Sequence, residues 1–93
     1  MAIKYQIRYL GEVVRKHIPA LSKSARELIK LTIEERLIVD PIGFGKPLQY
    51  SLKGHRRLRV GDYRIVYRIE IESETVVVVA IMHRKDIYKK FKF

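Results

Sequence analysis

The sequence contains no cysteine, few acidic residues and no long apolar run. The lack of cysteine excludes a disulfide framework and any zinc site built on thiolates. No apolar stretch approaches the ~20 residues that a membrane helix needs. The first ten residues, MAIKYQIRYL, alternate polar and apolar side chains and do not form the apolar segment of a signal peptide. We therefore expect a cytoplasmic protein that does not contact a membrane.

Ten acidic residues stand against twenty Lys and Arg, which gives a net charge of +10 and an isoelectric point near 10.1. A chain of 93 residues supports one domain, so residues 1–93 are expected to form a single unit with a thin hydrophobic core. An excess of positive charge on so small a domain attracts polyanions. Composition alone therefore predicts a protein that binds RNA, DNA or an acidic protein partner.

Sequence motifs for metals and nucleotides are missing as well. The three histidines, His17, His55 and His83, are too widely separated along the chain to indicate a metal site. There is no zinc-protease motif and no phosphate-binding glycine loop. The serines lack a suitable base and orienting carboxylate for a catalytic triad. We therefore expect neither a metal ion nor a cofactor.

The first 20 residues predict a strand and a short helix. Apolar and polar side chains alternate from Ile3 to Tyr9, which is the two-residue period of a half-buried strand. The apolar residues between Val13 and Ile18 have helical spacing instead, and Pro19 stops that helix.

A longer helix is expected next, so that residues 10–40 form a helical hairpin. Ser24 and Glu27 have the spacing of a capping box at its start. Asp40 precedes a proline, which disfavours helical geometry and ends the helix there. The apolar face is expected to contain Ala25, Leu28, Ile29, Thr32, Ile33 and Leu37.

The remainder of the chain predicts a loop and a run of strands. Two glycines and two prolines place the loop at Pro41–Pro47. Tight turns at Gly61-Asp62 and Glu72-Ser73-Glu74 separate the later strands. The expected strands are Leu48–Leu52, Arg56–Val60, Tyr63–Ile71 and Thr75–Met82, followed by a loop or short helix at His83–Phe93. This order of elements indicates an α+β fold with helices packed on one face of a sheet.

The turn at Gly61-Asp62 has a consequence for the faces of that sheet. A two-residue turn pairs Arg59 with Arg64, and directly paired residues share a face. One face is then apolar and carries Leu58, Val60, Tyr63, Ile65, Tyr67 and Ile69. The other is basic, has no neutralising carboxylate of its own, and carries His55, Arg57, Arg59, Arg64, Val66 and Arg68. Like charges placed opposite one another reduce stability, so the basic face suits an anion. A solvated strand face or a docking surface for a partner explains the same pattern.

Arginine on this face, together with the C-terminal tail, suggests chemistry on RNA. RNA can be cut without a metal when its 2′-OH attacks the adjacent phosphate. The reaction needs a base, positive charge for the developing phosphorane and an acid for the leaving oxygen. Arginine forks match phosphate oxygens. In the tail, His83 can exchange protons near neutral pH, and Tyr88 can donate a proton or stack on a base. The alternative for the tail is a helix whose Ile87, Tyr88 and Phe91 pack on the sheet.

Several stretches resemble those of the RelE/ParE toxin superfamily. They are GKPL from Gly45, LKG from Leu52, LRVGDYRIVY from Leu58, and His83-Arg84 with Tyr88. The resemblance covers nearly the whole chain and implies a curved, mainly antiparallel sheet with two helices on one side. It also implies one of two activities. The RelE branch cleaves mRNA in the ribosomal A site without a metal, whereas the ParE branch poisons DNA gyrase.

The resemblance implies roles for five residues. Arg64 matches a phosphate-contacting arginine, and Arg57 stands where ribonuclease members place a catalytic lysine or arginine. Arg84 and Tyr88 match the C-terminal arginine and tyrosine. His83 joins them as a further candidate for proton transfer. Their joint presence favours the ribonuclease branch.

Two departures from the family pattern lie beside this set. His55 replaces a lysine of some relatives, which leaves the general base open, and Arg56 replaces an aromatic residue of many. The residues expected to bind RNA around the catalytic set are Lys53, His55, Arg56, Arg59, Arg68 and Lys85.

We therefore expect the toxin of a type II toxin–antitoxin system, acting as a metal-independent endoribonuclease on mRNA at the ribosome. The alternatives are a ParE-type gyrase inhibitor without nuclease activity and a general RNA-binding module. The expected partners are mRNA, the ribosome and a RelB-like antitoxin that is acidic where it touches the basic face. A heterotetramer with the antitoxin is one arrangement, and the oligomeric state stays open.

Overall fold

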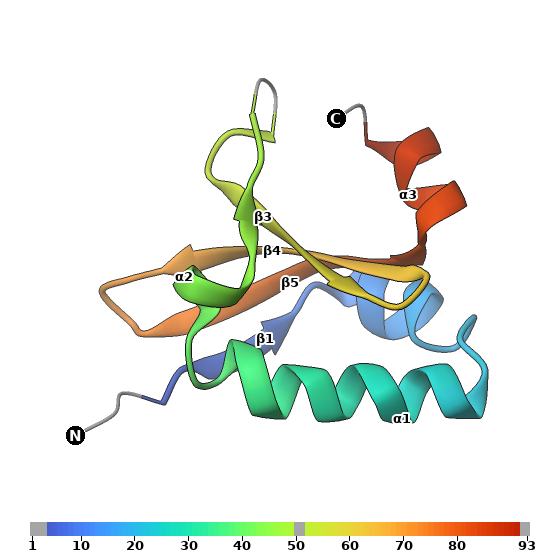
Figure 1. Ribbon diagram of the computed structural model, residues 1–93, viewed down its shortest axis with the longest axis horizontal. Coiled ribbons are helices and arrows are strands. Elements are labelled where there is room, and N and C mark those ends of the chain that lie inside the picture. The colour runs from blue at the N-terminus through green and yellow to red at the C-terminus, as the bar shows by residue number, and fades with distance from the viewer. Residues whose placement is uncertain (1–3, 50–51, 92–93) are drawn as a thin grey trace.

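The sheet of this protein has the strand order β1-β5-β4-β3-β2 in the computed structural model, which describes residues 4–49 and 52–91 (Figure 1). The strands are β1 Gln6–Tyr9, β2 Lys46–Pro47, β3 His55–Val60, β4 Tyr63–Glu70 and β5 Thr75–His83. β1 runs parallel to β5, and the other neighbouring strands are antiparallel. The expected α+β fold with a mainly antiparallel sheet is confirmed.

The helical hairpin covers the face that was predicted to be apolar. It consists of η1 Val13–His17, α1 Lys23–Thr32 and η2 Ile33–Leu37, in which the η segments are π-helical. Its buried side chains pack against those of β3, β4 and β5, including Ile65 and Tyr67. Figure 1 shows α1 on one side of the sheet and α3 Arg84–Lys90 on the other. Within the described part of the chain, no helix is long and apolar enough to cross a membrane.

Two expectations for the long helix are wrong. Ser22, not Ser24, caps it: the Ser22 backbone is extended, and its Oγ accepts a hydrogen bond from Ala25 N at 3.1 Å. Ser24 already lies inside the helix and cannot serve as the cap. Leu28 is 47% exposed, because the helix turns this side chain away from the sheet. The other predicted positions on the apolar face are buried, namely Ala25, Ile29, Thr32, Ile33 and Leu37.

The expected loop at Pro41–Pro47 contains a one-turn helix, α2 Pro41–Phe44, followed by β2. Asp40 begins this turn, since its side chain accepts a hydrogen bond from Gly43 N at 2.9 Å. The strand expected at Leu48–Leu52 is not formed at Leu48, Gln49 and Leu52, because the chain already pairs with β3 at β2. Residues 50 and 51 of that expectation, like Ile3 of the first strand, lie outside the described residues.

The tail forms α3, and this helix covers part of the predicted basic face. Ile87 is fully buried with Val66 and Ala80 in a second, smaller core. Phe91 is partly buried against the same cluster, so the packing of Ile87 and Phe91 on the sheet is confirmed, whereas Tyr88 is 49% exposed. The basic face is therefore not fully solvated, and α3 brings a third segment of the chain next to its arginines.

Candidate nucleic-acid interface

The β3–β4 hairpin sets the relative positions of the arginines. Its register pairs Val60 with Tyr63 and Arg59 with Arg64, as the turn predicted. Gly61 has φ +58°, a conformation that glycine adopts without the strain of a side chain and that tight hairpin turns require. Arg57 lies two residues from Arg59 along β3 and so shares its face. The hairpin thus places three arginines side by side on one surface.

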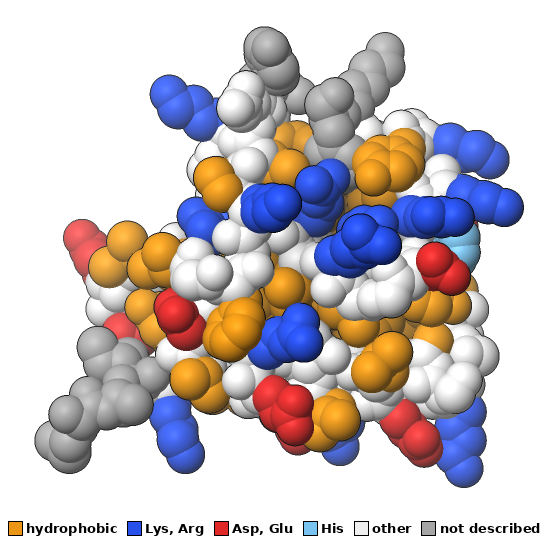
Figure 2. Space-filling model, viewed as in Figure 1, with side chains coloured by type: hydrophobic (Ala, Val, Ile, Leu, Met, Phe, Trp, Pro, Cys, Tyr) orange, Lys and Arg blue, Asp and Glu red, His pale blue; other side chains and the backbone are white. Residues whose placement is uncertain are grey.

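A groove of about 320 Å³ runs along these arginines. It is lined by Arg36, Phe44, Lys46, Arg57, Leu58, Arg59, Arg64 and Tyr88, so five of the eight residues are cationic and none is acidic. β2 pairs with β3 at Arg56 and Arg57. The following part of β3, which includes Leu58 and Arg59, forms the edge of the sheet and lines the groove. In Figure 2, Lys and Arg side chains gather above this region of β3 and α3. The groove is therefore positively charged along its length.

Arg64 is buried and held by its own hairpin turn. Only 6% of the residue is exposed, and its Nη1 donates hydrogen bonds to the carbonyl oxygens of Gly61 at 3.0 Å and Tyr63 at 2.9 Å. These bonds fix the guanidinium against its own hairpin turn. A preorganised cation stabilises developing negative charge without rearranging during the reaction. Arg59, directly opposite, is exposed.

Tyr88 reaches the groove because α3 is fixed at several points. Ile87 anchors the helix in the second core, and His83 caps it by accepting a hydrogen bond from Lys85 N at Nδ1. Lys90 Nζ lies 2.7 Å from Glu12 Oε1, and this contact lowers the pKa of the Glu12 carboxyl below its usual value. The helix thus carries Tyr88, which is half exposed, to the lining of the groove.

Two members of the predicted catalytic set lie outside the groove lining. The His83 ring contacts Tyr63 edge-on with centroids 5.6 Å apart, and its Nδ1 is engaged as the cap of α3. Arg84 Nε lies 3.9 Å from Asp62 Oδ1, and its side chain is half exposed. The structure therefore brings Arg57, Arg64 and Tyr88 together and leaves His83 and Arg84 at the base of α3.

Arg56 was expected to bind RNA, and its position argues against that role. Arg56 pairs with Tyr67, on the face of the sheet that the helical hairpin covers. Its Nη2 donates hydrogen bonds to the carbonyl oxygens of Ile42 at 2.6 Å and Gly45 at 2.7 Å. Tyr67 Oη donates to Pro41 O at 2.6 Å, and burial raises the pKa of this phenol, which keeps it protonated as a donor. Arg56 and Tyr67 thus clamp α2 to the sheet.

The remaining predicted RNA contacts surround the groove but do not line it. Lys53 and Lys85 are exposed, and His55 is half-buried opposite Arg68. Arg68 Nη2 lies 3.9 Å from Glu70 Oε1, which corrects the expectation that the basic face has no carboxylate. Within residues 4–49 and 52–91, no three His, Cys, Asp or Glu side chains lie together as metal ligands would.

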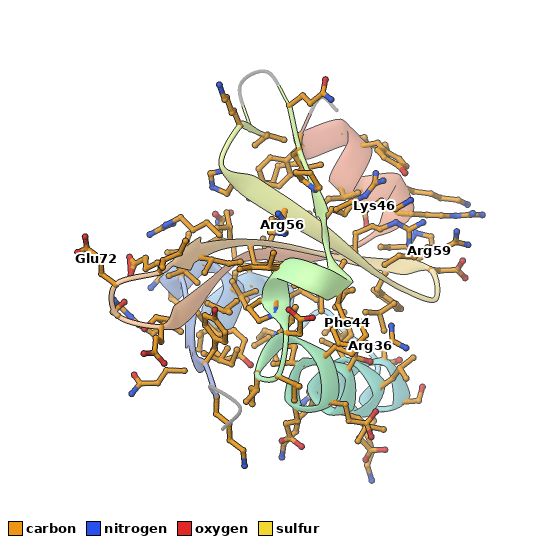
Figure 3. All side chains as sticks on the ribbon, turned by 60° about the vertical axis from the view of Figure 1, so that its left-hand side comes forward. Arg36, Phe44, Lys46, Arg56, Arg59 and Glu72 are labelled. Atoms are coloured by element: carbon orange, nitrogen blue, oxygen red, sulfur yellow. The ribbon has the colours of Figure 1, made fainter. Side chains whose placement is uncertain are left out.

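Four groove residues were not among the predicted site residues, and one of them, Leu58, is a buried residue of β3. Arg36 comes from η2, Phe44 from α2 and Lys46 from β2 (Figure 3). Lys46 stands within the GKPL stretch that resembles the toxin family, so the sequence did contain an indication that this residue belongs to the site. Arg36 and Phe44 carry no local signal, because only the folding of α2 against η2 brings them to the sheet edge.

The fold and the groove define a class of protein: a small α+β domain with a cationic groove at the edge of its sheet. The chain belongs to the family described as the ParE toxin of the type II toxin–antitoxin system parDE, whose family model matches residues 6–88. The resemblance to the RelE/ParE superfamily is thereby confirmed.

Relatives of known name support the RelE branch. Toxin RelE3 of Methanocaldococcus jannaschii is 37% identical over 79 residues, which are 82% of this chain and 84% of that protein. Toxin RelG of Mycobacterium tuberculosis is 45% identical over 51 residues, which are 55% of this chain and 59% of that protein. In the toxin–antitoxin complex RelBE2 of M. tuberculosis, one chain superposes with a TM-score of 0.82 at 30% identity, covering 88% of this chain and 93% of that one.

Proposed function

We propose that this protein is the toxin of a type II toxin–antitoxin pair and cleaves mRNA as an endoribonuclease at the ribosome. The observation that carries the proposal is the groove in which Arg57, Arg64 and Tyr88 meet on one surface. A cationic groove with a hydroxyl at its side suits a phosphodiester and its leaving oxygen. The similarity to toxins named RelE3 and RelG points to the same branch.

The reaction is an attack of the ribose 2′-oxygen on the neighbouring phosphorus. A base takes the proton of the 2′-hydroxyl, the bond between O2′ and phosphorus forms, and the bond between phosphorus and O5′ breaks. A proton delivered to O5′ completes the cleavage, which leaves a 2′,3′-cyclic phosphate and a 5′-hydroxyl. In this proposal Arg64 and Arg57 neutralise the phosphorane, and Tyr88 delivers the proton to O5′.

The outer residues have supporting roles in this scheme. Arg59 and Lys46 extend the positive surface along the strand of RNA. Arg84, half exposed beside Asp62, contacts phosphates further along. His83 acts as a positioning residue for α3, since its ring nitrogen caps that helix. The proton of the 2′-hydroxyl leaves to a base outside this set.

A cognate antitoxin is part of the proposal. RelB–RelE complexes from Methanococcus jannaschii and from M. tuberculosis are among the solved structures that this chain resembles. An antitoxin segment rich in Asp and Glu would complement the cationic groove and compete with RNA for it. The partner is therefore expected to be acidic where it contacts Arg57, Arg59 and Arg64.

A second function has one observation in its favour. The matching family model is that of ParE toxins, and that family includes gyrase inhibitors by the resemblance described above. On this alternative the cationic surface contacts a protein target instead of RNA. Mapping of mRNA 5′ ends separates the ribonuclease from the gyrase inhibitor, because only a ribonuclease produces new mRNA ends.

The test is induced expression of the wild type, Arg57→Ala and Tyr88→Phe, with growth followed and mRNA 5′ ends mapped. The proposal expects growth arrest with new ends inside reading frames for the wild type, and strongly reduced cleavage for both variants. Arg68→Ala is the matched control. It removes the same charge from the same face outside the groove, beside Glu70.

Three results would contradict the proposal. Arrest with intact mRNA and over-relaxed or broken DNA supports the gyrase alternative. Equal loss of cleavage in Arg57→Ala and Arg68→Ala shows that total charge matters and that the groove does not. Unchanged cleavage in Tyr88→Phe removes the tyrosine from the chemistry.

A further inference from the structure

Phe44 is an exposed aromatic side chain at the end of a cationic groove. It is 47% exposed, and it lines the groove together with Arg57 and Arg64. The guanidinium of Arg36 lies over its ring, 5.7 Å from the centroid (Figure 3). An aromatic ring next to phosphate-binding cations is the arrangement with which proteins hold single-stranded nucleic acids.

The position of Phe44 is fixed by the fold. Asp40 caps α2, Tyr67 Oη donates to Pro41 O at 2.6 Å, and Arg56 donates to carbonyl oxygens at both ends of the turn. Gly45 follows directly, and a side chain there would overlap the Tyr67 hydroxyl. These contacts hold the turn close to the sheet. The ring is therefore presented by a rigid turn with little freedom left to lose on binding.

The groove connects this ring to the proposed reaction centre. α2 contacts η2 of the helical hairpin, whereas α3 packs against Val66 and Ala80 on the opposite face of the sheet. Phe44 and Tyr88 therefore reach the same groove from different elements, and Arg57 and Arg64 line it with them. A strand of RNA whose phosphate lies on the arginines places a neighbouring base near the Phe44 ring.

We propose that Phe44, backed by the Arg36 guanidinium, is a stacking platform for a base next to the phosphate held by Arg57 and Arg64. The inference rests on the proposed ribonuclease function and adds a base-binding subsite to it. Stacking on an aromatic ring accepts every base, but purines offer a larger face than pyrimidines. The subsite therefore favours a purine without demanding one.

The experiment uses purified full-length toxin and ribosomes programmed with a short synthetic mRNA. Cleavage rates are compared for the wild type, Phe44→Ala and Phe44→Tyr. We expect Phe44→Ala to cut roughly 5- to 150-fold more slowly, which is the range of effect that loss of one base–aromatic stack produces. Phe44→Tyr keeps the ring and restores the rate. Ile42→Ala is the control, since Ile42 is equally exposed on the same turn but does not line the groove.

A second substrate distinguishes stacking from a general effect on the fold. When the base on one side of the cleaved bond is replaced by an abasic ribose, wild type and Phe44→Ala should cut at similar rates. A gap as large as that on the intact mRNA that persists for every abasic position overturns the proposal, and so does equal cutting of the intact mRNA by the two proteins. Loss of binding to an acidic antitoxin peptide with unchanged cleavage assigns Phe44 to the partner instead. A wild type that cuts no mRNA overturns the ribonuclease proposal and this subsite with it.

Discussion

The replacement Ile87→Ala tests whether α3 holds the reaction centre together. Ile87 is fully buried, and its neighbours in the second core, Val66 and Ala80, are too small to fill the space that it leaves. Removing a buried isoleucine side chain to alanine costs about 2–5 kcal/mol. The total stability of a domain of this size is about 5–14 kcal/mol. The replacement therefore removes a large part of the stability that holds the native state.

The effect is expected to be greater on activity than on global folding. α3 has seven residues, and a helix of that length is not stable in water without tertiary contacts. Its loss is a local opening that leaves the main core of Ile65 and Tyr67 intact. Tyr88 is displaced when α3 detaches. Cleavage should consequently fall further than the fraction of unfolded protein explains.

The measurement combines urea unfolding with the cleavage assay at a temperature at which the variant is folded. Ile71→Ala is the matched control, because the same side chain is removed from a position that is 69% exposed. Its stability should change by less than about 0.5 kcal/mol. An Ile87→Ala protein that is destabilised as expected but cuts mRNA at the wild-type rate would refute the idea that α3 positions Tyr88. A loss below about 0.5 kcal/mol would refute the packing argument itself.

Three further predictions follow from other contacts. Tyr67→Phe removes a buried hydroxyl that donates to Pro41 O at 2.6 Å, and it should lower the free energy of unfolding by about 1–3 kcal/mol in urea titrations; an unchanged midpoint would contradict this. Burial lowers the pKa of His17 below 6.5, and its neutral Nδ1 accepts a hydrogen bond from Ile81 N at 3.2 Å. The contribution of neutral His17 to stability is therefore fully present above pH 6.5 and is lost as the pH falls through the lower pKa of the folded state. The free energy of unfolding in urea should therefore change more between about pH 7.5 and pH 5.5 for the wild type than for His17→Gln. Finally, Arg59→Gln should reduce the slope of log affinity for single-stranded RNA against log salt by about 0.7, and an unchanged slope would mean that this side chain contacts no phosphate.

The hairpin at the centre of the site could be predicted from the sequence because its information is local. A Gly-Asp turn between two apolar runs specifies the pairing of Arg59 with Arg64, and the structure has that register. The apolar and basic faces of β3 and β4 follow from this register and from the two-residue period of strands. The local sequence is therefore sufficient to predict that Arg57, Arg59 and Arg64 share one face of the hairpin.

Other parts of the site depend on contacts that are distant in sequence. Arg36 and Phe44 enter the groove only because α2 folds against η2 and is clamped by Arg56 and Tyr67. Arg56 was predicted to bind RNA because it stands beside Arg57 in the sequence, but adjacent residues of a strand point to opposite faces, and Arg56 pairs with Tyr67 instead. The prediction that Ser24 caps α1 was wrong for a different reason. Ser22 and Ser24 have the same chemistry, and only the extended backbone at Ser22 decides between them.

The groove opposes the stability of the fold that carries it. Arg59 lies opposite Arg64, Arg57 is on the same face, and like charges at such positions destabilise a sheet. Arg64 is in addition buried, where a charge loses hydration and keeps only the hydrogen bonds to Gly61 and Tyr63. The main core beneath and the second core under α3 supply the stability that tolerates this arrangement. A polyanion that enters the groove removes the repulsion and stabilises the folded state, so under the proposed function RNA and an acidic antitoxin would compete for one source of binding free energy.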